Sequence, residues 1–350
     1  MAKKFKRLMV LVGMFKSGST TLQHMFKKMR RGSAERMDMI DTNHSVGCSM
    51  WFGSVLKYER TLLNFGHSPA SAERHLNRIK KRVARQLERS SCDELVISSE
   101  WLSDGGYEGE GRRGALRRLR EEFEPHFERI EIYGYVRPPV GFTTSATQEI
   151  MKMRPFFMTP WAGYRRRFGP LRDIFGRENV HLRLFKRDRL KDQDIMTDFQ
   201  DWVGWTPQPY RIKATNLSMT AAGAALVHCY QRNRGPIETV RHHRQKVRAV
   251  AKLGKVGGPK FVLSQPVQHS LLTEHADDLA WMEKILREPI NDHKPDPQEP
   301  PWAVGDLDDL KRCAARFAPL LFGEAAQEPP DDPDRADAMA WDAIRQKFRL

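Results

Sequence analysis

Cysteine is scarce in this chain. Its 350 residues include four cysteines, Cys48, Cys92, Cys229 and Cys313, and no two of them stand at the spacing of a metal-ligand pair. Neither a small disulfide-built secreted scaffold nor a cysteine-based zinc module is therefore indicated. The default expectation is a reducing, cytoplasmic environment.

Long apolar runs are also missing. No stretch approaches the roughly 18 consecutive apolar residues that indicate a transmembrane helix. The first residues, MAKKFKRLMVLVGMF, combine basic side chains with a short apolar core as a signal peptide does. Removing that core would delete what we interpret as a strand, so a signal peptide is not expected. The sequence contains no internal repeat, and its 40% hydrophobic and 29% charged residues are typical of a globular protein.

Acidic residues are fewer than basic ones. Asp and Glu number 44 against 59 Lys and Arg, which gives a net charge of +15. Such a charge indicates an anionic partner: nucleic acid, a membrane surface, or a polyanionic cofactor and acceptor. The local basic clusters at 80–82, 112–120 and 165–167 each favour a solvated helix face when taken singly. No nucleic-acid recognition motif or ribbon of alternating aromatic and basic residues is present, so nucleic acid is not the expected partner.

The most informative stretch is Leu8–Phe26, LMVLVGMFKSGSTTLQHMF. It begins with a short apolar run closed by Gly13, which is typical of a buried parallel strand. Small and hydroxylic residues around Lys16 follow, and then Leu22, Met25 and Phe26 recur at helical spacing. A strand, a small-residue loop and a helix form a phosphate cradle, because the loop amides and the helix N-terminus point at the anion.

The common nucleoside-triphosphate loop, G-x-x-x-x-G-K-[ST], is absent because Lys16 precedes Gly18 instead of following it. The order Lys16-Ser17-Gly18-Ser19-Thr20-Thr21 resembles the 5′-phosphosulfate-binding loop of sulfotransferases that use 3′-phosphoadenylyl sulfate (PAPS). The alternative is an ordinary helix N-cap rich in Ser and Thr after a strand. Met14-Phe15 departs from the proline or histidine that many relatives carry before the lysine.

A second motif supports the same resemblance. An expected strand over 130–136 ends in Arg137-Pro138-Pro139, and Ser145 follows the arginine by eight positions. In sulfotransferases an arginine and a serine at this spacing bind the 3′-phosphate, a suitable task for a guanidinium and a hydroxyl. Singly, Arg137 could cap a strand end and Ser145 could lie on a helix surface. Pro138 replaces the Asp or Asn often found there, which removes no anion-binding group.

The resemblance also implies a catalytic base. Ser98-Ser99-Glu100 follows the apolar run Leu95–Ile97 and resembles the strand end where carbohydrate sulfotransferases place a catalytic glutamate. The alternative is a carboxylate that caps a helix starting at 101 or 102. His44, His67 and Glu149 are other candidates. Lys16 would stabilise the leaving group, and this chemistry demands no metal.

Weaker similarity extends along the chain. The segments 184–190, 194–195 and 199–204 resemble the late strand and helix of bacterial sulfotransferases, and Asn216-Leu217-Ser218 resembles a following Asn-x-Ser element. The resemblance covers about residues 8–218 and is strongest at the two binding motifs.

Apolar runs alternate with helical patterns over the first two-thirds of the chain, which predicts a parallel sheet. With the resemblance, the expectation is an α/β P-loop-type three-layer fold with about five strands and a mostly helical C-terminal extension. Residues 1–205 would form the PAPS-binding core, 206–325 a helical part of the same domain, and 326–350 a linker and terminal helix. Expected helices include 69–89 after Ser68, 219–231 with Ser218 as N-cap, and 273–287.

The function implied is transfer of the sulfuryl group from PAPS to a hydroxyl or amine of a carbohydrate or glycoconjugate, which leaves 3′-phosphoadenosine 5′-phosphate (PAP). The basic stretches 161–168 and 237–253 would suit an acidic polysaccharide or a glycolipid acceptor. A small-molecule kinase that uses ATP and magnesium is one alternative, although its Gly-Lys-[Ser/Thr] is absent. A non-catalytic basic binding protein is another.

Overall fold

The computed structural model describes residues 5–14, 16–32, 37–40, 44–53, 62, 67–103, 111–212, 218–236 and 240–348. The chain divides into two compact units. Unit 1 contains Met1–Pro138, Gly163–Asn216 and Asp277–Ile290, and unit 2 contains Pro139–Ala162, Leu217–Ala276 and Asn291–Leu350. The expected domain boundaries at residues 205 and 325 stay a prediction.

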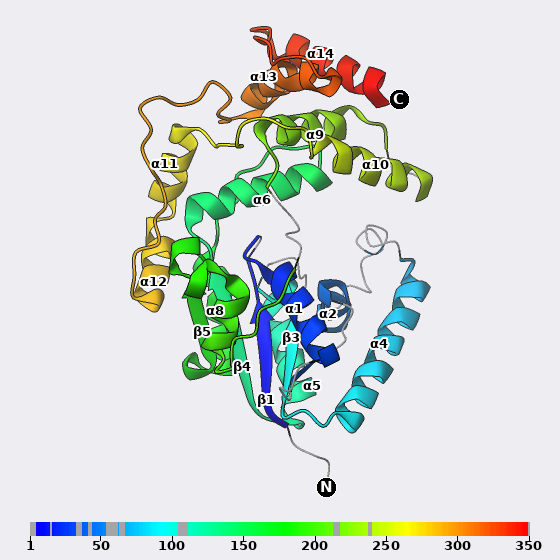
Figure 1. Cartoon of the computed structure of the whole chain (residues 1–350), viewed down its shortest axis with the longest axis vertical. Helices are drawn as coiled ribbons and strands as arrows, with labels where there is room; N and C mark the ends of the chain where they lie inside the picture. Colours follow the sequence, from blue (N-terminus) through cyan, green and yellow to red (C-terminus); the bar gives the residue numbers. More distant parts are fainter. Residues whose placement is uncertain are drawn as a thin grey trace. The chain divides into compact units, whose positions relative to one another are not determined.

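Unit 1 is built on a parallel sheet (Figure 1). Its strands are β1 (Phe5–Val12), β2 (Met37–Met39), β3 (Glu94–Ser98), β4 (Phe127–Val136) and β5 (Val180–Leu184), in the order β2-β3-β1-β4-β5. In the register, Leu8 lies opposite Leu95 on one side and Ile130 on the other. All four strand pairs are parallel, which confirms the expected α/β fold with a central parallel sheet.

Helices cover both faces of this sheet. Side chains that alternate along β1 and β4, among them Met9, Leu11 and Tyr133, pack against Phe26 of α1 and Phe199 of α8. The opposite face meets α7, because a methyl group at Gly134 would lie 3.4 Å from the Phe168 ring. The α helices of unit 1 are α1 (Ser19–Gly32), α2 (His44–Phe52), α4 (Pro69–Arg89), α5 (Gly111–Phe123), α7 (Tyr164–Phe175), α8 (Ile195–Trp202) and α12 (Ala276–Leu286), whose first residue belongs to unit 2. The 3₁₀ helices are η2 (Glu100–Leu102), η3 (Arg177–Asn179), η4 (Arg187–Arg189) and η5 (Lys191–Gln193).

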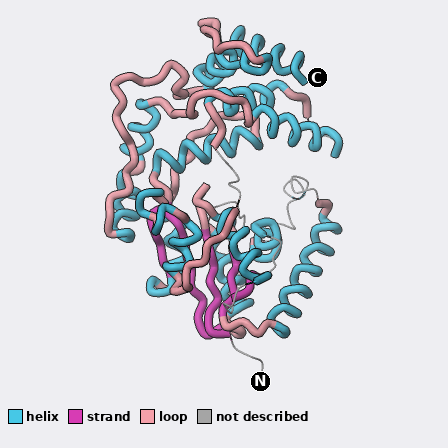
Figure 2. Tube along the Cα trace, viewed as in Figure 1, coloured by secondary structure: helices cyan, strands magenta, loops and turns pink. Residues whose placement is uncertain are grey.

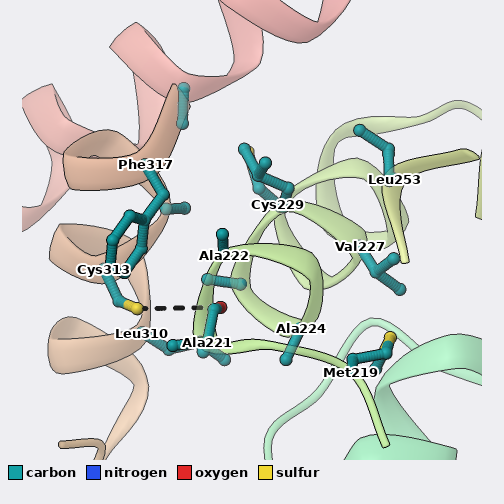
Figure 3. Packing of buried hydrophobic residues seen from close by; sticks show 14 of the residues in the cluster. Met219, Ala221, Ala222, Ala224, Val227, Cys229, Leu253, Leu310, Cys313 and Phe317 are labelled. Carbon is teal, nitrogen blue, oxygen red and sulfur yellow. Dashed lines mark hydrogen bonds between the residues drawn. The ribbon is translucent and has the colours of Figure 1, made fainter. Parts of the chain in front are cut away.

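Unit 2 is helical throughout its named elements (Figure 2). These are α6 (Pro139–Met153), α9 (Ala221–Asn233), α10 (Val240–Leu253), α11 (Gln265–Glu274), α13 (Leu307–Phe317), η6 (Ala318–Phe322) and α14 (Pro333–Phe348). Figure 3 shows its core, where α9 presents small residues such as Ala222 and Ala224, and the Cys313 thiol of α13 points at the Ala221 carbonyl from 3.9 Å. The small side chains of α9 let neighbouring helices approach, and the helix is buried from Ala221 to Gln231. The expected helical C-terminal region is confirmed.

Helix boundaries test the capping predictions. The helix α4 starts as expected, with Ser68 as N-cap accepting a hydrogen bond from the Ser71 amide at 3.3 Å. The prediction that Ser218 caps the next long helix of unit 2 is wrong. Thr220 is the N-cap of α9 and accepts from the Gly223 amide at 2.9 Å. The Ala221 amide, which is the third helical position for a cap at Ser218, donates instead to the Pro259 carbonyl at 2.8 Å.

The helix expected over 273–287 is α12, which begins later, at Ala276, because Thr273 and Glu274 are the last residues of α11. The chain breaks at His275, whose φ of −119° and ψ of 24° are not helical.

All four cysteines are free thiols. No helix in the described ranges has both the length and the apolar stretch needed to cross a bilayer.

Candidate functional site

The loop between β1 and α1 is a tight turn. Lys16 and Gly18 both have left-handed backbone conformations, with φ of 58° and 80°. The Ser17 amide donates to the Met14 carbonyl at 3.1 Å, and the Ser17 hydroxyl accepts from the Met14 amide at 3.1 Å. Turns of this kind direct successive backbone N–H groups to one side, which makes an anion-binding concavity.

Both glycines of the loop lie in close contact with neighbouring side chains, and Gly18 also has a left-handed backbone. A methyl group at Gly18 would lie 2.3 Å from Cδ1 of Ile195, the first residue of α8. At Gly13 it would lie 3.2 Å from Ser17 Oγ and 3.2 Å from Cγ of Glu100. The loop therefore packs directly against the end of β3 and the start of α8.

Glu100 contacts this loop. It is the first residue of η2, two positions after the end of β3, and its carboxylate accepts a hydrogen bond from the hydroxyl of Ser19, the first residue of α1. Ser99 is the N-cap residue of η2 and makes no side-chain capping bond. A carboxylate at the N-terminus of α1 lies where the helix dipole favours negative charge.

Ser103 completes the support of the loop and was not found from the sequence. Its fully buried hydroxyl lies within hydrogen-bonding distance of the carbonyl oxygens of Gly13 and Glu100. Its own carbonyl accepts from Nη1 of Arg112 at 2.7 Å and from Nη1 of Arg167 at 3.5 Å. No motif marks Ser103, because its partners lie on separate segments of the chain.

Arg167 corrects one sequence expectation. The sequence favours a solvated helix face for the cluster 165–167, but Arg167 is only 3% exposed, whereas Arg165 and Arg166 are exposed. The difference arises because α7 turns Arg167 toward the end of η2, where the Ser103 carbonyl accepts its guanidinium.

Arg137 joins the end of β4 to the same loop. Its backbone amide donates to the sulfur of Met14 at 3.3 Å, and its Nη1 donates to the carbonyl of Lys16 at 3.3 Å. The hydroxyl of buried Tyr164 donates to the Arg137 carbonyl at 2.8 Å. Arg137 is therefore held at both its backbone and its side chain.

The site lies at the carboxyl ends of three neighbouring strands. The loop with Lys16 follows β1, Glu100 follows β3, and Arg137 follows β4, and β1 pairs in parallel with both other strands. In open α/β sheets, ligands bind at this edge, at the point where the strand order reverses. Backbone amides and two cations can bind an anion here, while one carboxylate can accept a proton.

The remaining candidates belong to other elements. Ser145 is buried on α6 and Glu149 pairs with Lys152 at 2.7 Å, both within unit 2. The His67 ring lies 5.1 Å from the His75 ring in unit 1. The side chain of His44, and Asn216 with Leu217, lie outside the described residues.

Thr20 and Thr21 lie half-exposed in the first turn of α1. No group of three or more His, Cys, Asp or Glu side chains that could hold a metal occurs in the described part of the chain.

Comparisons with known proteins concern the fold. No family model matches the chain, and no curated protein sequence matches it. A crystal structure of a sulfotransferase from Alicyclobacillus acidocaldarius is similar at 13% identity, covers 80% of this chain and 95% of that chain, and has a TM-score of 0.42. A structure from the PezAT chromosomal toxin–antitoxin system of Streptococcus pneumoniae is similar at 11% identity, covers 72% of this chain and 89% of that one, and has a TM-score of 0.32. At these values neither structure assigns an activity to this chain.

Proposed function

We propose that this protein is a sulfotransferase, which passes the sulfuryl group of PAPS to a hydroxyl or amine of a carbohydrate or glycoconjugate. One observation supports this proposal above the others. The β1–α1 loop with Lys16, the carboxylate of Glu100 and the guanidinium of Arg137 follow three adjacent strands of unit 1, and Glu100 and Arg137 each contact the loop. These are the residues that the sulfotransferase-like motifs nominate.

The loop would bind the 5′-phosphosulfate. Backbone amides from Gly18 into the first turn of α1, with the hydroxyls of Thr20 and Thr21, would surround the phosphate oxygens, while the Ser19 hydroxyl donates to Glu100. As the sulfur–oxygen bond breaks, negative charge grows on the bridging oxygen of the departing bisphosphate. Lys16 would neutralise that charge in the transition state, which is where electrostatic stabilisation accelerates the reaction.

Arg137 would bind the 3′-phosphate. A guanidinium offers several donors in one plane, so one nitrogen can hold the Lys16 carbonyl while others bind phosphate oxygens. Ser145 is proposed for the same phosphate on its sequence spacing alone. A cofactor with this second phosphate would then be preferred over one without it.

Glu100 would be the general base. The acceptor oxygen or nitrogen attacks sulfur, its proton passes to the Glu100 carboxylate, and the electron pair of the broken bond leaves with PAP. The hydrogen bond from Ser19 would hold the carboxylate at the loop that binds the transferred group. This arrangement needs no metal ion for proton transfer.

The acceptor proposal rests on charge. The helix α10, which covers most of the basic stretch 237–253, exposes Arg244, Arg248 and Lys252. In the stretch 161–168, Tyr164, Arg167 and Phe168 are buried, so Arg165 and Arg166 remain for an acidic acceptor. If alanine at the exposed basic positions leaves acceptor affinity unchanged, these surfaces do not bind the acceptor.

Calorimetric titration with PAP tests the proposal. Wild type should bind PAP without magnesium, and Lys16→Ala and Arg137→Ala should each weaken binding at least about tenfold, because each removes a charged donor. Lys81→Ala and Arg85→Ala, which remove the same charge from the exposed face of α4, should bind as wild type does.

ATP with magnesium is the competing ligand in the same titration. Binding of ATP with magnesium but not of PAP would move the protein to the kinases. Binding of neither nucleotide would favour a non-catalytic basic protein.

A further inference from the structure

Three cations converge at one place in unit 2. Arg154 follows the last residue of α6, Arg234 is the C-cap residue of α9, and Lys246 lies on α10. The Lys246 ammonium donates to the Met153 carbonyl at 3.1 Å, and Arg234 donates to Gln231 Oε1 at 2.8 Å and to the Gly235 carbonyl at 3.0 Å. Among the residues with described placement, none of the three forms an ion pair with a carboxylate.

The environment of Lys246 shows that the three charges act on one another. Burial lowers the pKa of Lys246, and repulsion from Arg234 and Arg154 lowers it further. Like charges that lie close together without a countercharge are destabilising unless an anion joins them. The cluster is therefore complementary to an external anion.

Large apolar side chains are exposed beside the same cations. Met153 is 54% exposed, Phe156 42% and Val247 53%, and the Arg154 guanidinium lies 5.8 Å from the centre of the Phe156 ring. Scattered exposed apolar residues are ordinary, but a group of them indicates an interaction surface. Here they accompany Arg154 and Lys246 in the sequence and in space.

The same combination continues along α10. Its sequence, VRHHRQKVRAVAKL, has no acidic residue, and Ala249 and Leu253 face the core while Arg244, Val247 and Arg248 are exposed. At its C-terminal end, α10 (Figure 1) borders a cavity of about 360 Å³. Its lining includes Lys252 and Lys347 together with Leu320, Leu321 and Phe348.

We infer that this surface of unit 2 docks onto a membrane containing anionic phospholipid. The docking surface consists of Arg154, Arg234 and Lys246 with Met153, Phe156 and Val247. Basic residues on an amphipathic helix attract anionic headgroups, while neighbouring apolar side chains enter the boundary between headgroups and acyl chains. A bilayer satisfies both the charges and the apolar groups. Nucleic acid would satisfy only the charges, since aromatic stacking platforms are few here.

Vesicle co-sedimentation with the full chain tests this inference. The assay contains neither nucleotide nor acceptor, so its outcome is independent of the proposed activity. Wild type should bind vesicles of phosphatidylcholine and phosphatidylglycerol in equal parts, and should not bind vesicles of phosphatidylcholine alone. Each basic residue near an anionic surface contributes roughly fivefold, so Arg154→Ala/Arg234→Ala/Lys246→Ala should lower partitioning on the order of 100-fold.

A second variant isolates the apolar contribution. Met153→Ser/Phe156→Ser/Val247→Ser keeps every charge and should lower binding to the anionic vesicles by about tenfold or more, because it removes side chains that enter the acyl boundary. The variant Arg154→Lys/Arg234→Lys keeps the charges and should bind as wild type does. Lys81→Ala/Arg85→Ala/Arg89→Ala, which removes three charges from α4, should also bind as wild type does. Thermal unfolding of each variant checks that the fold is kept.

Two results would overturn the inference. One is equal binding of wild type and the Arg154/Arg234/Lys246 variant to the anionic vesicles, or no binding by either. The other is that the cation variant loses vesicle binding while the serine variant keeps it, and that the two variants bind duplex DNA in the same way. That pattern would indicate a purely electrostatic surface.

Discussion

The hydroxyl of Ser19 donates a hydrogen bond to the carboxylate of Glu100, and this bond joins the first residue of α1 to the end of β3. The two residues lie 81 positions apart in the chain. The bond gives Glu100 two separable tasks. It can hold the β1–α1 loop in place, and, in the proposed reaction, it can accept the proton of the acceptor.

Glu100→Gln and Ser19→Ala separate these tasks. Gln keeps an oxygen that can accept from Ser19 but cannot take a proton, so we expect kcat to fall at least about 100-fold while PAP binding changes little. Ser19→Ala keeps the base and should weaken PAP binding with a smaller effect on kcat. Steady-state kinetics and calorimetry on both variants measure the split. If Glu100→Gln keeps full kcat, Glu100 only supports the loop.

Because Lys16 has a left-handed backbone, two substitutions can distinguish the effect of its charge from the effect of its backbone strain. A residue with a β-carbon at φ of 58° is strained by about 1 kcal/mol or more, and glycine is not. We expect Lys16→Gly to unfold at or above the wild-type temperature and Lys16→Ala to unfold no higher than wild type.

Both Lys16 variants should lose PAP affinity to the same extent, because both lose the ammonium group. Calorimetry against PAP and thermal unfolding measure the two effects. A glycine variant that keeps full PAP affinity would show that Lys16 does not contact the nucleotide.

Gly18→Ala should disrupt the loop through two effects. The β-carbon would clash with Cδ1 of Ile195 at 2.3 Å, and φ of 80° disfavours any residue other than glycine. Together these should cost about 2 kcal/mol or more of the free energy of unfolding.

The variant Gly18→Ala/Ile195→Ala removes the clash and leaves the backbone strain. Denaturant unfolding of wild type, Gly18→Ala, Ile195→Ala and the double variant forms a double-mutant cycle. We expect the double variant to lose less free energy of unfolding than the two single variants lose together. Strict additivity would show that the Ile195 contact does not constrain the loop.

His228 should make unit 2 sensitive to acid. Burial and, to a smaller extent, repulsion from Arg232 lower its pKa to about 4, and Asp337 opposes the shift. The folded protein therefore keeps His228 neutral, whereas the unfolded chain protonates it at a higher pH. The associated stability is complete above the unfolded pKa of roughly 6.5, and up to about 3 kcal/mol is lost as the pH falls to the folded value.

Replacing His228 by leucine tests this contribution to the pH dependence of stability. Carboxylates elsewhere in the protein also make stability depend on pH. The test therefore compares the free energy of unfolding of wild type and His228→Leu at each pH, and does not use the slope of either protein alone. Urea unfolding at several pH values should show a shallower decline for His228→Leu below roughly pH 6.5. Parallel declines for the two proteins would contradict the assignment.

Much of the secondary structure of unit 1 could be predicted from the sequence, because local patterns encode it. An apolar run followed by Gly13, and the spacing of Leu22, Met25 and Phe26, correspond to β1 and α1. Ser68 before Pro69 marked the start of α4. Where a local signal competed with a distant contact, the prediction was wrong: Ser218 is not the cap of α9, because the Ala221 amide donates to the Pro259 carbonyl and the helix begins only at Ala221.

The sequence by itself determined the parallel α/β character, the strand, small-residue loop and helix around Lys16, and the order of residues expected there, since periodicity, glycine placement and residue type act over a few neighbours. Only the tertiary structure decided that Ser103 holds the Gly13 carbonyl from 90 positions away, that Arg137 reaches the Lys16 carbonyl, and that Arg167 is buried and Arg165 is not. These contacts depend on which strands pair and on how each helix is rotated against the sheet. Both are set by packing of the whole core, and no short stretch of sequence encodes them.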